Sequence, residues 1–339
     1  MVADARAVLD TVVQRFAANP GRAAKGALHH VTEALGPTDW VTGPGDDAAV
    51  LPRARGKLLA AGEALYPPFV SRDPFGAGIG AVLANVNDIA AMGGRPLGII
   101  DTIVASAPIA RSILAGLRHA SELYDVPIVG GHLTVSEAEP SLSAFIVGEV
   151  TSPLLTRNVA PGQPLLVAAC LDGRLREDFP FFPSFEQRAG RMRGDVELLA
   201  RLAERGCCVA AKDVSMAGTL GSLAMLLEPT GTGVVVDLDR LPRPQDVALE
   251  TWLDVFPAFA FLLCAAPGRS EECIVAFEER GLVCRQVGTI DDLGTLRVRL
   301  DGHETALMHQ TRRATTGLAS SDSLGDSGAS RGGSDGQPA

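Results

Sequence analysis

Hydrophobic and polar positions alternate along this chain with two periods, one typical of helices and one typical of strands. Between residues 106 and 124, apolar side chains recur at helical spacing after a serine that suits a helix start, and Asp125-Val126-Pro127 follows as a stop. This pattern predicts a helix over 106–124. Similar patterns predict helices over 195–204 and 219–228, and a helical covering segment within 1–35.

Short aliphatic runs between turn residues predict strands in two sets. The first set begins near residues 58, 96, 127 and 141, and the second near 164, 207, 233, 259 and 282. The turn-rich stretch 156–162 separates them, so we expect an N-terminal domain over 1–155 and a C-terminal domain over 156–312. Both mix helices and strands at short spacing, which predicts an α+β fold with mixed α/β layers. Residues 313–339, rich in Ser, Gly and Asp, are expected to be a disordered tail.

Charge and cysteine content exclude several classes of protein. The chain has 339 residues with 40 Asp and Glu against 30 Lys and Arg, a net charge of −10, and no basic run longer than two, which argues against nucleic-acid binding. No uncharged apolar stretch suits a bilayer crossing, and the N-terminus lacks a signal-peptide pattern. The six cysteines show no C-x-x-C spacing. We therefore expect a cytoplasmic protein with buried cysteines that binds neither nucleic acid nor membranes.

Two adjacent aspartates, Asp46 and Asp47, lie between a turn that includes Gly45 and an apolar run at 48–51. Adjacent like charges repel each other. A divalent cation that links them to phosphate oxygens would make the pair favourable, because Mg²⁺ prefers hard oxygen ligands. The alternative is a solvated turn, in which aspartate is common. This segment alone leaves both interpretations open.

The run from Phe75 to Gly94 holds a single charged residue, Asp88. At helical spacing both faces of the run are small or apolar, so a helix here is expected to be buried. A buried ionised carboxylate needs a cation or several hydrogen-bond donors. Asp88 is therefore either a metal ligand or a core acid satisfied by a donor network.

The same run contains a Gly-x-Gly-x-x-Ala pattern at 76–81, which occurs in dinucleotide-binding proteins. That pattern requires a hydrophobic strand directly before it, whereas Ser71-Arg72-Asp73-Pro74 precedes it here. A dinucleotide-dependent oxidoreductase is retained only as an alternative function. The sequence has no G-x-x-x-x-G-K-[ST] phosphate loop.

Two further segments combine glycines with polar groups. The paired glycines at 130–131 follow an aliphatic run and would let backbone amides approach an anion, and His132 would suit a metal, a phosphate or a carboxylate. In 212–221, Asp213 and Ser215 precede a small-residue helix whose first N–H groups would suit an anion. A plain strand-to-loop turn and an ordinary helix cap are the alternatives.

Four segments in this order resemble the motifs of one superfamily. They are GDDAAVL at 45–51, ANVNDIAAMGGRPL at 84–97, VPIVGGH at 126–132 and KDVSMAGTLGSL at 212–223. Together they resemble the AIR synthase-like (PurM-like) superfamily, which includes aminoimidazole ribonucleotide synthetase, thiamine-monophosphate kinase, selenophosphate synthetase and a hydrogenase maturation protein. The resemblance spans about residues 36–292, and the motifs are most similar to those of thiamine-monophosphate kinase.

The resemblance implies a two-domain fold in which the N-terminal domains of a homodimer share a β-barrel and the C-terminal domain is α/β. It also implies an enzyme that uses ATP and Mg²⁺ to activate a small metabolite by phosphoryl transfer. By motif position, the implied Mg²⁺ ligands are Asp46, Asp47, Asp88 and Glu63. The residues implied to contact the nucleotide are Gly45, Asn87, Gly130, Gly131, Asp213, Ser215 and Gly218, with Asp88 and His132 at the reacting groups.

The chain departs from the kinase pattern at three positions. Glu63 and His132 stand where the kinase has aspartates, and Met216 stands where it has an acidic residue. The lost charge argues against thiamine phosphate as the substrate, and it leaves a nucleotide-binding sensor or assembly subunit without turnover as an alternative. Trp40, Tyr66 and the aromatic stretch at 179–185 either shape an acceptor pocket or serve as lid or packing residues.

Overall fold

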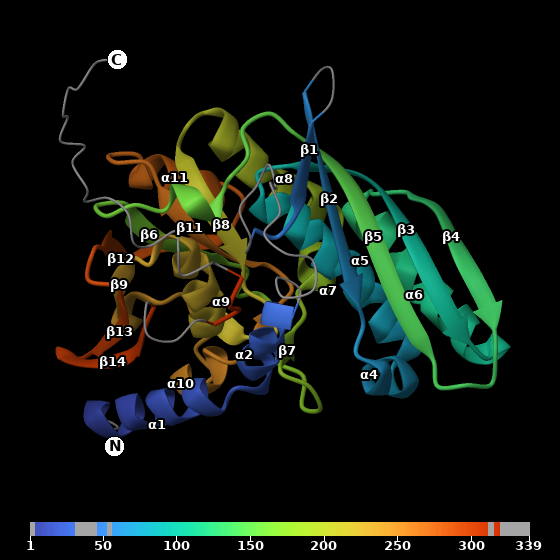
Figure 1. Ribbon diagram of the computed structural model, residues 1–339, viewed down its shortest axis with the longest axis horizontal. Helices are drawn as coiled ribbons and strands as arrows, with labels where there is room; N and C mark the ends of the chain where they lie inside the picture. Colours follow the sequence, from blue (N-terminus) through green and yellow to red (C-terminus); the bar gives the residue numbers. More distant parts are fainter. Residues whose placement is uncertain (1–3, 31–45, 53–55, 311–314, 319–339) are drawn as a thin grey trace, which may run out of the picture.

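Two β-sheets, each with its own helices, occupy opposite halves of the molecule (Figure 1). The computed structural model describes residues 4–30, 46–52, 56–310 and 315–318. Gly45 and most of the tail expected at 313–339 lie outside the described residues. The arrangement is the mixed α/β architecture that the sequence predicted. Among the described helices, none has the length and apolar character needed to cross a membrane.

Five strands form the sheet of the N-terminal half, in the order β1-β2-β5-β3-β4. Neighbours are antiparallel except β3 and β4, which are parallel. The strands predicted near 58, 96, 127 and 141 are confirmed. The expected turn at Gly130 and Gly131 is wrong, because β4 continues through both glycines. The bounds are β1 (Ala49–Pro52), β2 (Lys57–Ala64), β3 (Arg95–Ala105), β4 (Ile128–Val135) and β5 (Ser141–Val150).

Helices α5 (Pro74–Ala91) and α6 (Ala107–Tyr124) cover one face of this sheet, together with the short α4 (Pro67–Arg72). α6 matches the helix predicted over 106–124. A Cβ atom at Gly78 of α5 would lie 2.3 Å from the Ile113 carbonyl oxygen, and one at Gly116 of α6 would lie 2.1 Å from the Phe75 carbonyl oxygen. Glycine at both positions therefore lets the two helix backbones touch.

α5 is buried along most of its length, as its apolar pattern predicted. The Gly-x-Gly-x-x-Ala pattern at 76–81 lies inside this helix, and α4 rather than a strand precedes it. The glycines therefore do not form the strand-to-helix turn that a dinucleotide site needs. Their role is to allow close packing against α6.

The other face of the N-terminal sheet carries exposed apolar side chains. Ile100 on β3 pairs with Phe145 on β5, and both are exposed, as is Val147 further along β5. His132 on β4 pairs with Thr102, which lies two residues along β3 from Ile100, so His132 belongs to the same face. A grouped set of exposed apolar residues is typical of an interaction surface.

Seven strands form the second sheet, in the order β14-β13-β9-β12-β6-β11-β8. The strands predicted near 164, 207, 233, 259 and 282 are confirmed, whereas β13 and β14 were not predicted. A separate pair joins β7 (Phe181–Phe182) and β10 (Phe256–Pro257). The bounds are β6 (Pro164–Ala169), β8 (Cys208–Asp213), β9 (Gly233–Asp237), β11 (Ala260–Ala265), β12 (Val283–Asp291), β13 (Thr295–Leu300) and β14 (His303–His309).

Apolar residues alternate along the central strands of this sheet and build a core on each face. On β6, Leu166 and Ala168 pack with α8 (Met192–Glu204) and α11 (Ser270–Glu278), while Leu165 and Val167 pack with α9 (Gly218–Leu227) and α10 (Leu249–Trp252). The first of these cores continues into the N-terminal half through contacts of α8 with α5 and α6. The two halves therefore share one hydrophobic core.

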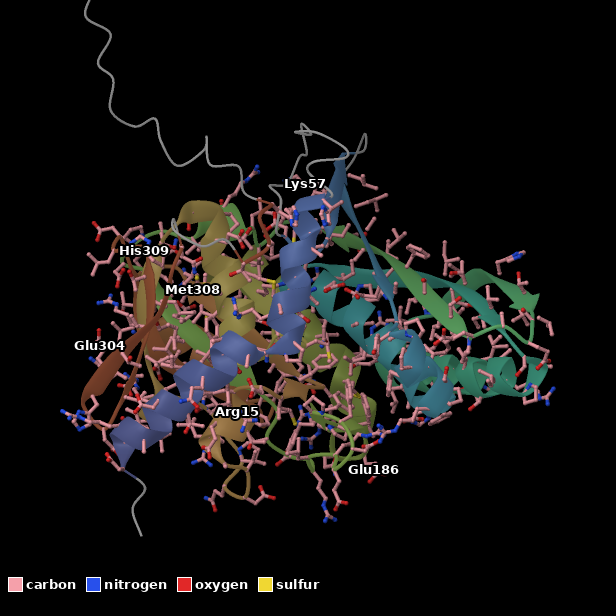
Figure 2. All side chains as sticks on the ribbon, turned by 60° about the horizontal axis from the view of Figure 1, so that its bottom comes forward. Arg15, Lys57, Glu186, Glu304, Met308 and His309 are labelled. Carbon is pink, nitrogen blue, oxygen red and sulfur yellow. The ribbon has the colours of Figure 1, made fainter. Side chains whose placement is uncertain are left out.

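The first helix of the chain packs on the C-terminal half of the molecule rather than on the N-terminal half. α1 (Ala5–Ala18) buries Leu9, Val12 and Phe16 against the second core of that sheet. Figure 2 shows it crossing this half, with Arg15 on its surface. The Arg15 Nε lies 2.6 Å from a carboxylate oxygen of Asp254. The predicted covering helix is confirmed, and it covers residues that follow it by about two hundred positions.

Residues 315–318 are part of the folded structure, contrary to the disordered tail expected from composition. The backbone N–H groups of Thr316 and Gly317 each donate to the carboxylate of Glu228 over 2.9 Å. Glu228, Thr315 and Thr316 are all buried. A buried carboxylate that accepts two hydrogen bonds fixes this segment against the end of α9.

Truncating the chain after Ala314 should lower the free energy of unfolding by about 1–3 kcal/mol, because Glu228 then loses both backbone donors while it stays buried. A chain that ends after Leu318 keeps the donors and is the matched control. Urea unfolding followed by circular dichroism measures both chains. Equal stability of the two would show that the segment 315–318 contributes nothing.

Candidate functional site

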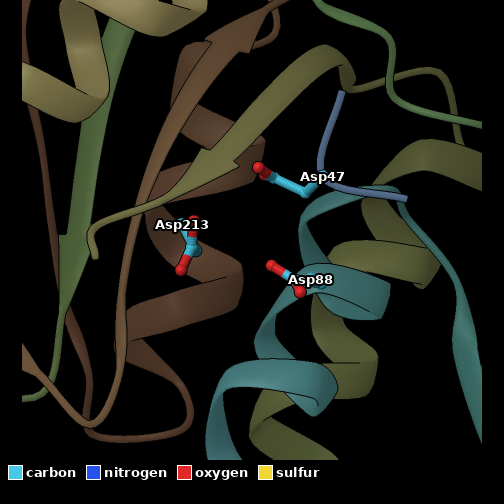
Figure 3. Close-up of side chains that lie close together, drawn as sticks. All are labelled: Asp47, Asp88 and Asp213. Atoms are coloured by element: carbon cyan, nitrogen blue, oxygen red, sulfur yellow. The ribbon is translucent and has the colours of Figure 1, made fainter. Parts of the chain in front are cut away.

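Three aspartates from distant parts of the sequence meet at the junction of the two halves (Figure 3). One carboxylate oxygen from each of Asp47, Asp88 and Asp213 lies within 4.8 Å of the other two. Asp47 precedes β1, Asp88 lies near the C-terminal end of α5, and Asp213 is the last residue of β8. We call this set the acid cluster. It exists only because α5 packs directly against β8.

A tight turn after β8 sets the position of Asp213. Gly218 has a φ of +69°, and a Cβ atom there would lie 2.2 Å from the Leu253 carbonyl oxygen. The Gly218 N–H donates to the carbonyl oxygen of Ser215 over 2.9 Å and closes the turn at the start of α9. Only glycine combines a positive φ with the absence of a Cβ atom, so the fold requires glycine at position 218 whether or not a ligand binds.

Lys212 supplies a positive charge inside the acid cluster. Its buried ammonium group contacts the Asp47 carboxylate, and its Nζ lies 3.6 Å from Asp213 Oδ1. Burial opposes the charge on this lysine, but Asp47 and Asp213 raise the pKa of Lys212 above its usual range. The sequence pattern at 212–221 did not single out this residue. A basic residue next to an aspartate that ends a strand was the available signal.

The acid cluster holds more negative charge than Lys212 neutralises. Burial raises the pKa of Asp88 well above its ordinary value, and the neighbouring Asp213 raises it further. Burial, reinforced by Asp47, raises the pKa of Asp213 to about 7. Burial also raises the pKa of Glu63 on β2, where Lys25 opposes the shift and Asp47 adds to it. The cluster and Glu63 therefore favour either protons or an additional cation.

The N-terminal segment brings a second lysine to this region. α2 (Pro20–Lys25) follows α1, and a Cβ atom at Gly21 would lie 2.2 Å from the Met216 carbonyl oxygen, so α2 packs on the turn after β8. Lys25 at its end acts electrostatically on Glu63 and Asp213. The segment expected only to cover the fold thus also adds charge near the cluster.

Asp46 has a different partner from its neighbour Asp47 and is not part of the acid cluster. Its Oδ1 accepts hydrogen bonds from the Thr156 backbone N–H over 2.8 Å and from the Thr156 hydroxyl over 2.7 Å. Burial is the main reason that the pKa of Asp46 rises to about 6. Of the adjacent acids, Asp47 joins the cluster, and Asp46 ties the segment before β1 to the domain boundary.

The remaining implied residues lie at different distances from the cluster. Asn87 is next to Asp88 on α5 and donates to the Ala258 carbonyl oxygen over 3.3 Å. Ser215 lies in the turn after Asp213. Gly130, Gly131 and His132 lie on β4, at the opposite edge of the N-terminal sheet from β1. Within one chain they are separated from the cluster, and their implied contact with a nucleotide stays a prediction.

The residues of the acid cluster fit a hard divalent cation. Carboxylate oxygens are the ligands that Mg²⁺ prefers, and three of them converge from two domains. Asp47 Oδ2 is buried and has no hydrogen-bond partner among the described residues, which is an unusual state for a carboxylate oxygen. A cation in this space would use that oxygen and offset the repulsion among the acids.

Comparison with known proteins identifies the family. Residues 45–150 match the model for the N-terminal domain of AIR synthase related proteins, and residues 184–301 match the model for their C-terminal domain. The chain belongs to the AIR synthase-related family. A family relative in Synechocystis sp., the uncharacterized protein sll0787, is 35% identical over 266 residues, which cover 78% of this chain and 82% of that protein.

Solved structures of two other proteins share the fold of this chain. T. maritima PurL complexed with ADP matches with a TM-score of 0.71 at 20% identity, over 83% of this chain and 48% of that chain. AaThiL complexed with AMPPCP and TMP matches with a TM-score of 0.60 at 20% identity, over 81% of this chain and 92% of that chain. The expected PurM-like fold is thereby confirmed.

Replacing Lys212 by Met should lower the free energy of unfolding of the metal-free protein by about 3–5 kcal/mol, because buried carboxylates lose their charged partner. Mg²⁺ should restore more stability to this variant than to the parent protein, since the cation replaces the missing charge. Thermal unfolding in EDTA and in MgCl₂ measures both effects. Lys57→Met, on the exposed start of β2, is the matched control. An equal response of all three proteins to Mg²⁺ would contradict the role of Lys212.

The metal-free protein should become less stable as the pH rises from about 5 to 7. In this window the folded state keeps the proton of Asp213, whose pKa is raised to about 7, whereas the unfolded chain releases it. Each such proton gives a slope of at most about 1.4 kcal/mol per pH unit. Urea unfolding in EDTA at several pH values measures the slope. Asp213→Asn should flatten it, and an unchanged slope in that variant would assign the effect to other groups.

Proposed function

We propose that this protein uses Mg²⁺ and ATP to transfer a phosphoryl group to an oxygen of a small metabolite. The convergence of Asp47, Asp88 and Asp213 carries the proposal, because three carboxylates that share a buried space suit a hard divalent cation. The fold supports the choice of nucleotide: one structure of this fold, T. maritima PurL, is complexed with ADP, and another, AaThiL, with AMPPCP and TMP.

The acid cluster would hold Mg²⁺, which neutralises charge on the phosphoryl oxygens during transfer. Lys212 keeps a fixed positive charge beside these acids, and Lys25 adds a second one nearby. In the reaction, an acceptor oxygen forms a bond to the γ-phosphorus while the bond to the β–γ bridging oxygen breaks, and ADP leaves with that electron pair. The chain contributes positioning and charge balance rather than a covalent intermediate.

Site residues outside the cluster receive narrower roles in this proposal. The charges of Asp47 and Lys212 act on Glu63, so Glu63 is a further candidate to hold a cation. Asp46 is assigned to holding the Asp47 segment through its two hydrogen bonds from Thr156. The residues next to the cluster in sequence are assigned to nucleotide contact, namely Asn87, Ser215 and Gly218.

We also propose that two copies pair through the open face of the N-terminal sheet. Ile100, Phe145 and Val147 are 43%, 48% and 38% exposed on adjacent strands, which is costly for a sheet face that stays in water. Pairing of two such faces would bury them and produce the shared barrel that the family resemblance implied. His132 lies on this face, so a partner would cover it.

All six cysteines are buried and unpaired, which supports a reducing compartment such as the cytoplasm.

Replacing Asp88 by Asn should weaken the binding of Mg²⁺-ATP by one to a few kcal/mol, because a buried ligand loses its charge. Calorimetric titration with Mg²⁺ and ATP measures the affinity. Asp101→Asn is the matched control, since Asp101 is also a buried acid of the N-terminal half and lies on β3, outside the cluster. If both variants bind as the parent protein does, the acid cluster is not the nucleotide-metal site.

An assay of ADP release distinguishes an enzyme from a nucleotide-binding sensor or assembly subunit. A protein without turnover remains the second candidate because three residues depart from the resembling kinase, which has aspartates at the positions of Glu63 and His132 and an acidic residue at that of Met216. ADP release over a panel of small acids, amides and alcohols tests turnover. Binding of Mg²⁺-ATP with no ADP release on any acceptor would favour the sensor.

A further inference from the structure

A cavity of about 460 Å³ lies beside the acid cluster, between α4, α5 and the segment 175–185. Glu63 and Met216 line one part of it, and both belong to segments that also carry or adjoin the cluster. Phe69, Phe179 and other aromatic residues line another part. Its volume is in the range of small-molecule sites.

Aromatic rings in defined contacts make up the apolar wall. The rings of Phe69 and Phe179 stack with centroids 5.2 Å apart and an interplanar angle of 11°. Phe181 lies 5.4 Å from Phe256 and 6.0 Å from Phe185, between ring centroids. The wall therefore joins α4, the 175–185 segment and β10, and it offers flat surfaces to a ligand.

The cavity has little charge to offer a ligand away from the acid cluster. Asp73 and Arg176 line it, but Arg176 Nη1 lies 3.0 Å from Asp73 Oδ2. Arg176 also donates two hydrogen bonds of 2.9 Å to Asp178. These pairs neutralise one another, so the remaining charged group among the described lining residues is Glu63, on the side of the cluster.

We propose that this cavity binds the uncharged, apolar body of the acceptor, a ring or a branched alkyl group, and directs the oxygen function of the acceptor toward the acid cluster. This inference deepens and rests on the proposed phosphoryl transfer. Aromatic walls bind apolar groups by burial, and a neutral wall gives no partner to a charged or strongly polar body. The chemical class of acceptor is therefore an apolar-bodied acid, amide or alcohol rather than a sugar phosphate.

Gly80 gives a way to fill the cavity without a change in charge. It lies on α5 and lines the cavity, and a Cβ atom there would meet Leu65 Cδ1 at 3.8 Å and Phe69 Cε1 at 3.9 Å, which are ordinary contacts. Gly80→Ala therefore leaves most of the space open, whereas Gly80→Leu extends into it. Both replacements favour the helix over glycine, so the pair isolates the effect of volume.

The probes are phenylacetate and benzyl alcohol, with acetate as the matched small acid, and the measurement is the dissociation constant by NMR titration. Phenylacetate or benzyl alcohol should bind the parent protein and Gly80→Ala alike, and should bind Gly80→Leu about tenfold more weakly or worse. Phe179→Ala, outside any helix, should weaken binding in the same direction. Acetate binding as tight as phenylacetate, no binding of either aromatic probe to the parent protein, or unchanged binding to Gly80→Leu and Phe179→Ala would overturn the proposal.

The orientation of the acceptor is tested with Mn²⁺ in place of Mg²⁺. Bound Mn²⁺ should broaden the methylene signal of phenylacetate more than the signal of the ring proton opposite it, because the carboxylate end lies toward the acid cluster. The reverse order would overturn the stated orientation. Failure of the parent protein to bind Mn²⁺ or Mg²⁺-ATP would refute the proposed function and the orientation with it, while the Gly80 comparison would still decide whether the cavity binds apolar groups.

Discussion

The structure depends on the burial of three like charges between two domains. Asp47, Asp88 and Asp213 repel one another, and burial removes the water that would otherwise screen them. Lys212 balances part of this charge, so the apo protein folds with an internal counter-ion. A cation bound at such a site would stabilise the fold, because it would relieve repulsion that the fold itself imposes. Its binding would therefore be linked energetically to the junction of the two domains.

α5 makes this arrangement possible. A helix that is apolar on every side packs against its own sheet, against α6 and against α8 and β8 of the other half. The glycine contacts at Gly78 and Gly116 hold α5 close to α6. Asp88 lies at the C-terminal end of this helix, where the two halves meet, so a fully packed helix carries one buried acid of the cluster.

The local sequence pattern was sufficient to predict most helices and strands and the burial of Asp88. Periodicity and the absence of other charges depend only on residues close together in the sequence. The local pattern was not sufficient to assign different roles to Asp46 and Asp47, since the hydrogen-bond partner of Asp46, Thr156, lies 110 positions further on. Lys25 was missed for the same reason, because only the folded chain brings it near Glu63 and Asp213. Lys212 directly precedes Asp213, but its contact with Asp47 also comes only from the fold. The glycines at 130 and 131 suggested a turn at the end of a strand, but both pair with β3, so strand β4 continues through them.

The positions at which this chain departs from the resembling kinase pattern are not distributed evenly over the site. The three acids that meet in one place are all present, and two of the three departures, Glu63 and Met216, line the aromatic cavity next to them. The third, His132, lies on β4, away from both. A change that abolished cation binding would be expected to remove a member of the cluster, and none is removed. Replacing an acidic residue by methionine instead takes charge from the wall where the acceptor would lie and adds apolar surface, which agrees with the neutral pairing of Arg176 in the same cavity. Under the proposed function, two of the three departures would therefore alter the acceptor wall and leave the acid cluster intact.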